Sequence, residues 1–134
     1  MSTNPLNGNL GDAAHFAGDY LFREKPLPNN GTIHSEEHTL NNTLGRLQLT
    51  GTISKTLALT GTNSLTAVLQ YKDDTEWRNL ATLFSASGVA TVPAGTLFEF
   101  VPPPNDSRRI CRLAVTTNFD ATAATLTAAV EILP

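Results

Sequence analysis

The sequence has a single cysteine among its 134 residues, and only 16% of its side chains are charged. One cysteine excludes an internal disulfide framework and any zinc site built from several cysteines. No apolar run in the chain approaches the roughly 18–20 residues that a membrane span requires. Met1 is not followed by a basic stretch and an apolar run, so we expect neither a secretory signal nor a membrane partner.

The few charges that are present nearly balance. The chain has 9 Lys and Arg against 12 Asp and Glu, which gives a net charge of −3. This balance lacks the basic surplus of a sequence-independent nucleic-acid binder, so no nucleic-acid partner is expected. The sequence also lacks a phosphate-binding loop, a dinucleotide glycine fingerprint and a G-x-S-x-G nucleophile motif.

Threonine is abundant instead. The chain has 19 threonines, and many of them alternate with Leu, Val, Ala or Ile. β-Branched side chains suit a pleated, half-buried surface. The shortage of Glu and Lys removes the usual solvent-facing side of helices. The composition therefore predicts an all-β chain.

From residue 47 onward, apolar and polar side chains alternate in short runs. Gly51, inside the first run, predicts a bulge or a close approach of two backbones. In a later run we expect Leu97 on one face of a strand and Phe98 on the other. Short strands separated by turn and proline signals predict a β-sandwich or jelly roll. The expected strands cover residues 47–53, 57–59, 65–71, 77–83, 96–101, 109–115 and 126–132.

Residues 1–46 look different, because turn signals and the prolines Pro26 and Pro28 interrupt any regular element. We expect an extended N-terminal arm over 1–46, with one or two helical turns around 12–22, followed by a β-sandwich domain over 47–134. Such an arm buries too little apolar area to fold alone, so it would become ordered on a partner. Its aromatic side chains are the expected contact residues: Phe16, Tyr20 and Phe22.

Three arginines form the only basic cluster: Arg108, Arg109 and Arg112. On a strand, Arg108 and Arg112 share one face and Arg109 lies on the other. These residues suit a clamp on a partner's carboxylate, since arginine offers a planar bidentate fork. The alternative is that they keep an edge strand soluble, and the sequence leaves both open.

Metal binding rests on one short segment. On a strand, His34, Glu36 and His38 would share a face and resemble a zinc triad. No second cluster of Cys or His supports that arrangement, so a polar surface segment is the favoured interpretation. We therefore expect no metal and no cofactor.

Catalysis has little support elsewhere in the chain. Asp73 and Asp74 would point to opposite faces of a strand, and their context favours a turn over a catalytic pair. Cys111, inside an alternating run, is expected in the core. Trp77 suits a sugar-stacking platform, an interface anchor or a core position beneath the turn, and the core position is favoured. The chain is not expected to be an enzyme.

The last half of the chain combines several features in a fixed order. A strand ends in a charged turn and Trp77, and the strand that follows the proline run carries arginine and then an apolar-Arg-Leu triplet. The final hairpin is rich in Thr and Ala. The segments concerned are 65–77, 92–96, 102–104, 108–113, 119–123 and 126–133. In this layout the chain resembles the small capsid cement (decoration) proteins of short-tailed, double-stranded DNA bacteriophages.

That resemblance implies a jelly-roll-like domain and a place on the outer capsid surface of the virion, after synthesis in the host cytoplasm. The partners it implies are the major capsid protein, whose subunits the protein would bridge, and further copies of itself. A dimer is expected, with a trimer as the alternative. The strand holding Arg108 to Arg112 would be a contact element. The alternative function is a carbohydrate-binding β-sandwich module of a phage fibre or surface protein.

Overall fold

The computed structural model describes residues 15–40, 47–102 and 109–132, which form strands and turns and no helix. No described part of the chain therefore provides a helix long and apolar enough to cross a membrane. The strands are β1 (His15–Pro26), β2 (Asn29–His34), β3 (His38–Leu40), β4 (Leu47–Ile53), β5 (Leu57–Leu59), β6 (Ser64–Asp73), β7 (Glu76–Ser87), β8 (Ala90–Val92), β9 (Gly95–Phe100), β10 (Arg109–Asp120) and β11 (Thr125–Ile132).

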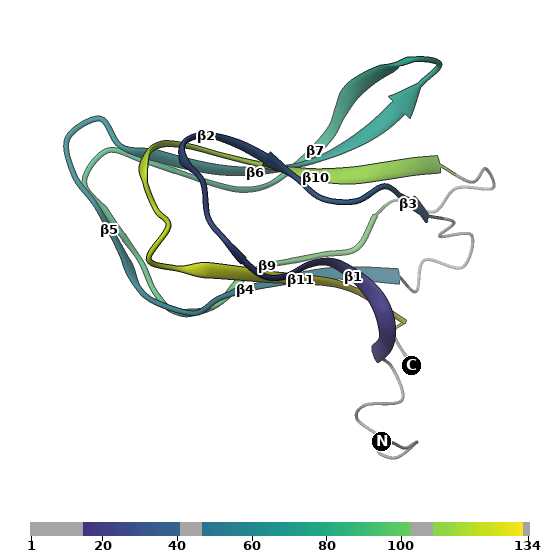
Figure 1. Cartoon of the computed structure of the whole chain (residues 1–134), viewed down its shortest axis with the longest axis horizontal. Helices are drawn as coiled ribbons and strands as arrows, with labels where there is room; N and C mark the ends of the chain where they lie inside the picture. The colour runs from purple at the N-terminus through teal and green to yellow at the C-terminus, as the bar shows by residue number, and fades with distance from the viewer. Residues whose placement is uncertain (1–14, 41–46, 103–108, 133–134) are drawn as a thin grey trace.

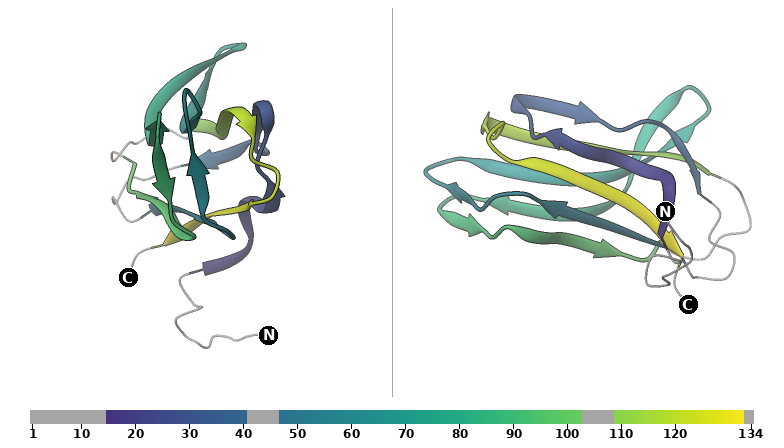
Figure 2. Two further views of the ribbon diagram at one scale, coloured as in Figure 1. Left: turned by 90° about the vertical axis from the view of Figure 1, so that its left-hand side faces the viewer. Right: turned by 60° about the horizontal axis from the view of Figure 1, so that its bottom comes forward.

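The strands form two antiparallel layers (Figure 1). One sheet has the order β1-β11-β4-β9, and the other has β2-β10-β6-β7, with β3 also paired to β10. β5 and β8 form a small two-stranded sheet at one end of the layers. The expected all-β sandwich is confirmed. Within the two main layers only β6 and β7 are both consecutive and paired, and their hairpin bends away from the sandwich (Figures 1 and 2).

Alternation along the strands builds the core. In β10, Cys111, Leu113, Val115 and Thr117 are each at most 1% exposed, while the residues between them are half-buried or exposed, apart from the buried Ala114. Since successive side chains on a strand point to opposite faces, these four lie on the face turned toward the other sheet. The core position expected for Cys111 is confirmed. The same pattern buries other side chains on the neighbouring strands: Leu49, Leu65, Ala67, Leu69, Leu126 and Ala128.

The expected boundary between an arm and a sandwich at residues 46 and 47 is wrong for the residues that the structure describes. β1 pairs with β11, whereas β2 and β3 pair with β10, so this segment supplies strands to both layers. Four of its apolar side chains lie in the core: Leu21, Phe22, Leu27 and Leu40. Burying such a side chain contributes roughly 1.5–3 kcal/mol, which offsets the entropy lost on ordering the segment. Residues 1–14 and 41–46 lie outside the described residues.

The helical turns expected around 12–22 are also wrong for residues 15–22, which belong to β1. Proline and turn residues are evidence against a regular element in this segment. However, β1 is an edge strand, where proline is tolerated. The pairing of β1 with β11 shifts register three times, and Glu24 has a positive φ of 47°. Such bulges twist an edge strand and protect it from pairing with other chains.

The close approach expected at Gly51 is confirmed. Gly51 on β4 lies opposite Phe98 on β9, and the pairing shifts register at the next residue, so that Leu97 has no partner. A Cβ atom at Gly51 would lie 2.4 Å from Cε2 of Phe98. The bulge also turns Leu97 and Phe98 inward together, at 8% and 5% exposed. The prediction that they lie on opposite faces is therefore wrong.

Candidate functional site

A row of polar side chains crosses three strands of the β2-β10-β6-β7 sheet. Arg112 of β10 lies opposite Gln70 of β6, and Gln70 lies opposite Asn79 of β7. Arg112 Nε donates a hydrogen bond to Gln70 Oε1 at 2.9 Å, and Gln70 Nε2 donates to Asn79 Oδ1 at 3.0 Å. Arg112 and Gln70 alternate with inward-facing residues and Asn79 is paired with Gln70, so the row lies on the outer face, which is turned away from the other sheet. We call Arg112, Gln70 and Asn79 the polar row.

Trp77 of β7 completes this surface. The guanidinium carbon of Arg112 lies 4.2 Å from the centre of the Trp77 ring, and Lys72 Nζ lies 6.0 Å from it. Trp77 is half-buried and is not part of the hydrophobic core cluster. The favoured core position for Trp77 is therefore wrong. In β7 it lies opposite Lys72, on the same face as the polar row.

These contacts hold Arg112 in one orientation. Its Nε atom is bonded and its guanidinium lies over an aromatic ring, while no described carboxylate lies within 4.0 Å of it. Its terminal N–H groups therefore have no ionic partner among the described residues. An arginine fixed in this way suits bidentate binding of a carboxylate, because little side-chain entropy is left to lose.

His34 lies near this arginine, on β2 at the edge of the same sheet. Burial, followed by the charge of Arg112, lowers the pKa of His34 below its usual value. Both effects favour the neutral form of His34, and the charge of Arg112 is the smaller of the two.

Arg109 lies on the other face of β10, as the alternation predicted. Its guanidinium carbon lies 5.3 Å from the centre of the Tyr71 ring, which packs against the core. Between the two arginines, burial raises the pKa of the Cys111 thiol to about 11, and the charge of Arg109 opposes this in part. Arg108 lies outside the described residues. The two arginines of this cluster that the structure describes, Arg109 and Arg112, therefore lie on opposite faces of β10 and do not form one clamp.

The expected aromatic contact residues have different surroundings. Phe22 is 5% exposed in the core, so it is not available to a partner, and that part of the prediction is wrong. Tyr20 is half-buried, and the guanidinium carbon of Arg23 lies 4.2 Å from its ring centre. Phe16 lies in β1, but its side chain is not among those that the structure describes.

His34 and His38, the two histidines of the disfavoured zinc triad, do not share a face. His34 lies opposite Ala114, and His38 lies opposite Cys111. The chain between them has one residue more than β10, and this extra residue reverses the alternation. In the part of the chain that the structure describes, no group of three or more His, Cys, Asp or Glu side chains is placed to hold a metal ion.

Ser35 maintains the pairing at this bulge. Its backbone N–H donates to the carbonyl of Leu113 at 2.9 Å, and its Oγ accepts from the Leu113 N–H at 2.8 Å. The Ser35 hydroxyl therefore takes the place of a backbone carbonyl in the ladder.

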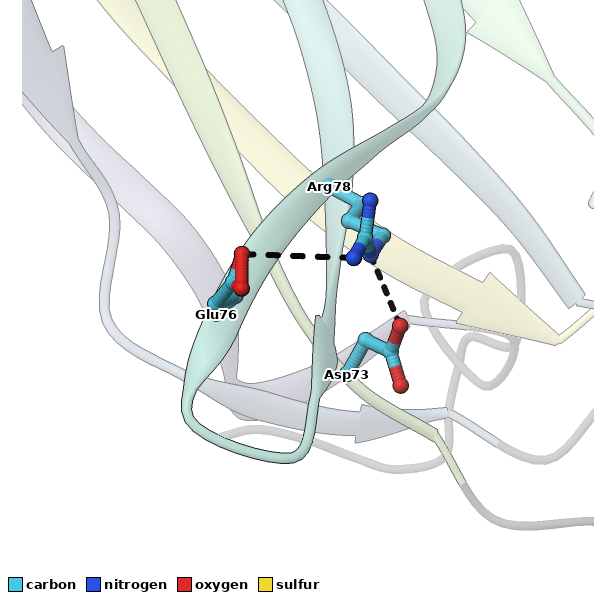
Figure 3. A network of polar contacts seen from close by, with 3 residues as sticks. All are labelled: Asp73, Glu76 and Arg78. Carbon is cyan, nitrogen blue, oxygen red and sulfur yellow. Dashed lines mark hydrogen bonds and ion pairs between the residues drawn. The ribbon is translucent and has the colours of Figure 1, made fainter.

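The turn interpretation of Asp73 and Asp74 is confirmed. Asp73 pairs with Glu76 at the end of the β6–β7 hairpin, and Asp74 has the positive φ of 61° that a tight turn requires. Figure 3 shows Arg78 between the two flanking carboxylates: Nε lies 2.7 Å from Asp73, and Nη2 lies 3.9 Å from Glu76. Arg78 and Asp73 are 54% and 52% exposed, so this ion pair adds little stability.

The structure also contains a cavity that was not predicted from the sequence. This cavity, of about 410 Å³, lies between β1 and the segment from His34 to Glu36. Basic side chains of β1, Arg23 and Lys25, contribute to its lining. Treating residues 1–46 as an arm concealed this cavity, because its walls come from edge strands of both sheets.

Sequence reasoning also missed Gln70 and Asn79. The alternation around Gln70 does place it on the outer face, but only the register between β6, β7 and β10 aligns it with Arg112. Comparison with known proteins adds no further assignment: no protein-family model matches the chain, and no curated protein matches its sequence.

Proposed function

We propose that this chain is a bacteriophage capsid decoration protein, which binds the outer surface of the head and stabilises contacts between major capsid protein subunits. The observation that carries the proposal is the orientation of Arg112. Trp77 and Gln70 hold its guanidinium, and its terminal N–H groups have no carboxylate partner among the described residues. Such a group suits a carboxylate on the surface of a protein partner.

The strand order supports the jelly-roll part of this proposal. Sheets ordered β1-β11-β4-β9 and β2-β10-β6-β7, joined by connections that mostly change layer, fit the eight-stranded double sheet of a jelly roll. Jelly rolls occur in viral capsid domains and in lectins, so the fold is compatible with both functions considered from the sequence. The choice between them depends on the site.

The site favours a protein partner over a sugar. Stacking on a sugar requires an open aromatic face, and Arg112 lies over the ring of Trp77, the only tryptophan. A decoration protein also acts through many repeated weak contacts, which add when several copies bind one surface. We propose that the protein binds the major capsid protein as a homo-oligomer, as a dimer or alternatively as a trimer, in the virion.

The test is co-sedimentation of the purified chain with heads of the phage that encodes it. We expect the wild-type protein to bind, and Arg112→Glu to bind roughly tenfold or more weakly. Lys55→Glu is the matched control, because Lys55 is exposed and has no ionic partner in the described part of the chain. Its binding should be unchanged.

Failure of the wild-type chain to bind heads would contradict the proposal. A clear sugar ligand on a glycan array, lost in Trp77→Ala, would favour the carbohydrate-binding alternative. Native mass spectrometry of the free protein would give the number of copies in the oligomer.

A further inference from the structure

The cavity between β1 and β2 lies where the two layers meet at their edges. β1 pairs only with β11, and β2 pairs only with β10, so each strand has one edge that no described strand covers. The volume of about 410 Å³ falls within the roughly 300–1,000 Å³ of protein ligand sites. Its walls combine these strand edges with side chains from both layers.

The charged residues of the cavity are not paired with one another. Arg23 and Lys25 come from β1, and Glu36 comes from the segment that follows β2. No ion pair joins Arg23 or Lys25 to a carboxylate among the described residues. Arg23 is held over the ring of Tyr20 at 4.2 Å, which limits its freedom. Two positive charges against one negative charge favour an anionic occupant.

The remaining surroundings restrict the kind of anion. Leu21 and Phe22 line the cavity and are 5% exposed, so part of its wall is apolar. Glu36 would repel the continuous negative charge of a nucleic-acid backbone, whereas a peptide offers N–H groups that a carboxylate accepts. The open edge of β2 likewise suits an extended peptide, which can add backbone hydrogen bonds to such an edge.

We propose that this cavity binds an extended, acidic peptide segment of a partner protein. Carboxylate side chains of the segment would meet Arg23 and Lys25, and its backbone would lie along β2, since the bulges of β1 disfavour pairing with another chain. The cavity is distinct from the polar row, which belongs to the outer face of the second sheet. The proposal therefore does not depend on the capsid function, and a failure to bind heads leaves it unaffected.

The experiment uses the full chain and a fluorescein-labelled short peptide of alternating glutamate and valine. Fluorescence anisotropy should show saturable binding of this peptide, and much weaker binding of the matched peptide with lysine in place of glutamate. The double variant Arg23→Glu/Lys25→Glu should bind roughly tenfold or more weakly. Lys55→Glu should bind like the wild-type chain, since Lys55 lies outside the cavity lining.

Two further measurements exclude trivial explanations. Arg23→Gln and Lys25→Gln remove one charge each, and circular dichroism verifies that every variant is folded. Amide chemical-shift changes caused by the acidic peptide should concentrate on residues 20–25 and 34–36. Equal binding of the acidic and basic peptides, equal weakening by Lys55→Glu, or tighter binding of a single-stranded oligonucleotide than of the acidic peptide would overturn the proposal.

Discussion

Arg112 and Trp77 come from strands that are not neighbours, yet the guanidinium carbon of Arg112 lies 4.2 Å from the Trp77 ring centre. β6 lies between their strands and supplies Gln70, which accepts the hydrogen bond of Arg112 Nε. The side chain of Arg112 is thus held from two sides across the width of the sheet. This arrangement distinguishes Arg112 from an ordinary surface arginine that only keeps an edge strand soluble.

The first prediction is a measurable coupling between these two side chains. In a double-mutant cycle with Arg112→Ala and Trp77→Ala, we expect a coupling free energy of about 1 kcal/mol in favour of the pair, as for a half-buried cation–π contact. Urea unfolding followed by circular dichroism provides the four stabilities, because Trp77→Ala removes the only tryptophan fluorescence. Additive effects of the two single changes would contradict the proposed positioning of Arg112.

The second prediction concerns the packing of Phe98 on Gly51. Gly51→Ala should lower the free energy of unfolding by about 1–3 kcal/mol, because the new Cβ would overlap the Phe98 ring and both strands are fixed by pairing. Gly31→Ala on β2 is the matched control, since its Cβ would meet nothing closer than 3.7 Å. Urea unfolding compares them. Phe98→Leu combined with Gly51→Ala should recover part of the loss, and equal effects of the two glycine changes would show that packing is not the cause.

The third prediction is a loss of stability at mildly acidic pH. Because the pKa of His34 is lowered in the folded protein, the unfolded chain binds a proton there more readily. The contribution of His34 is therefore fully present above its usual pKa of about 6.5 and is lost as the pH falls below it. Urea midpoints should decrease between about pH 8 and pH 5, a range in which most carboxylates stay ionised. His34→Gln should flatten this part of the profile, and an unchanged slope in that variant would assign the effect to other groups.

The fourth prediction concerns the reactivity of Cys111. Its side chain is 1% exposed, and its pKa is raised to about 11, so little thiolate is present near neutral pH. A thiol reagent should label the folded protein roughly a hundredfold or more slowly than the urea-unfolded chain, since labelling then requires opening of the strand pairs. A cysteine introduced by Ala123→Cys in a Cys111→Ala background provides the exposed control. Rapid labelling of folded wild-type protein would show that β10 opens readily.

Local patterns predicted a large part of the fold. The alternation from residue 47 onward located the strands of that part except β8, the Asp73–Asp74 pair marked a hairpin turn, and Gly51 marked a close approach. These features depend mainly on residues that are adjacent in the chain, so the sequence alone is enough to predict them. The segment from residue 15 to 40 was misjudged because its prolines and bulges interrupt the pattern, whereas its burial depends on distant strands.

The amino-acid sequence by itself determined the all-β character of the protein, since a period of two fixes which side chains share a face of a strand. The same period placed Arg109 and Arg112 on opposite faces and Cys111 in the core. Only the tertiary structure decided that Arg112, Gln70 and Asn79 form one row, and that Arg23, Lys25 and Glu36 line one cavity. Strand pairing joins residues far apart in the chain, and its register is set by the packing of the whole core and not by local preference.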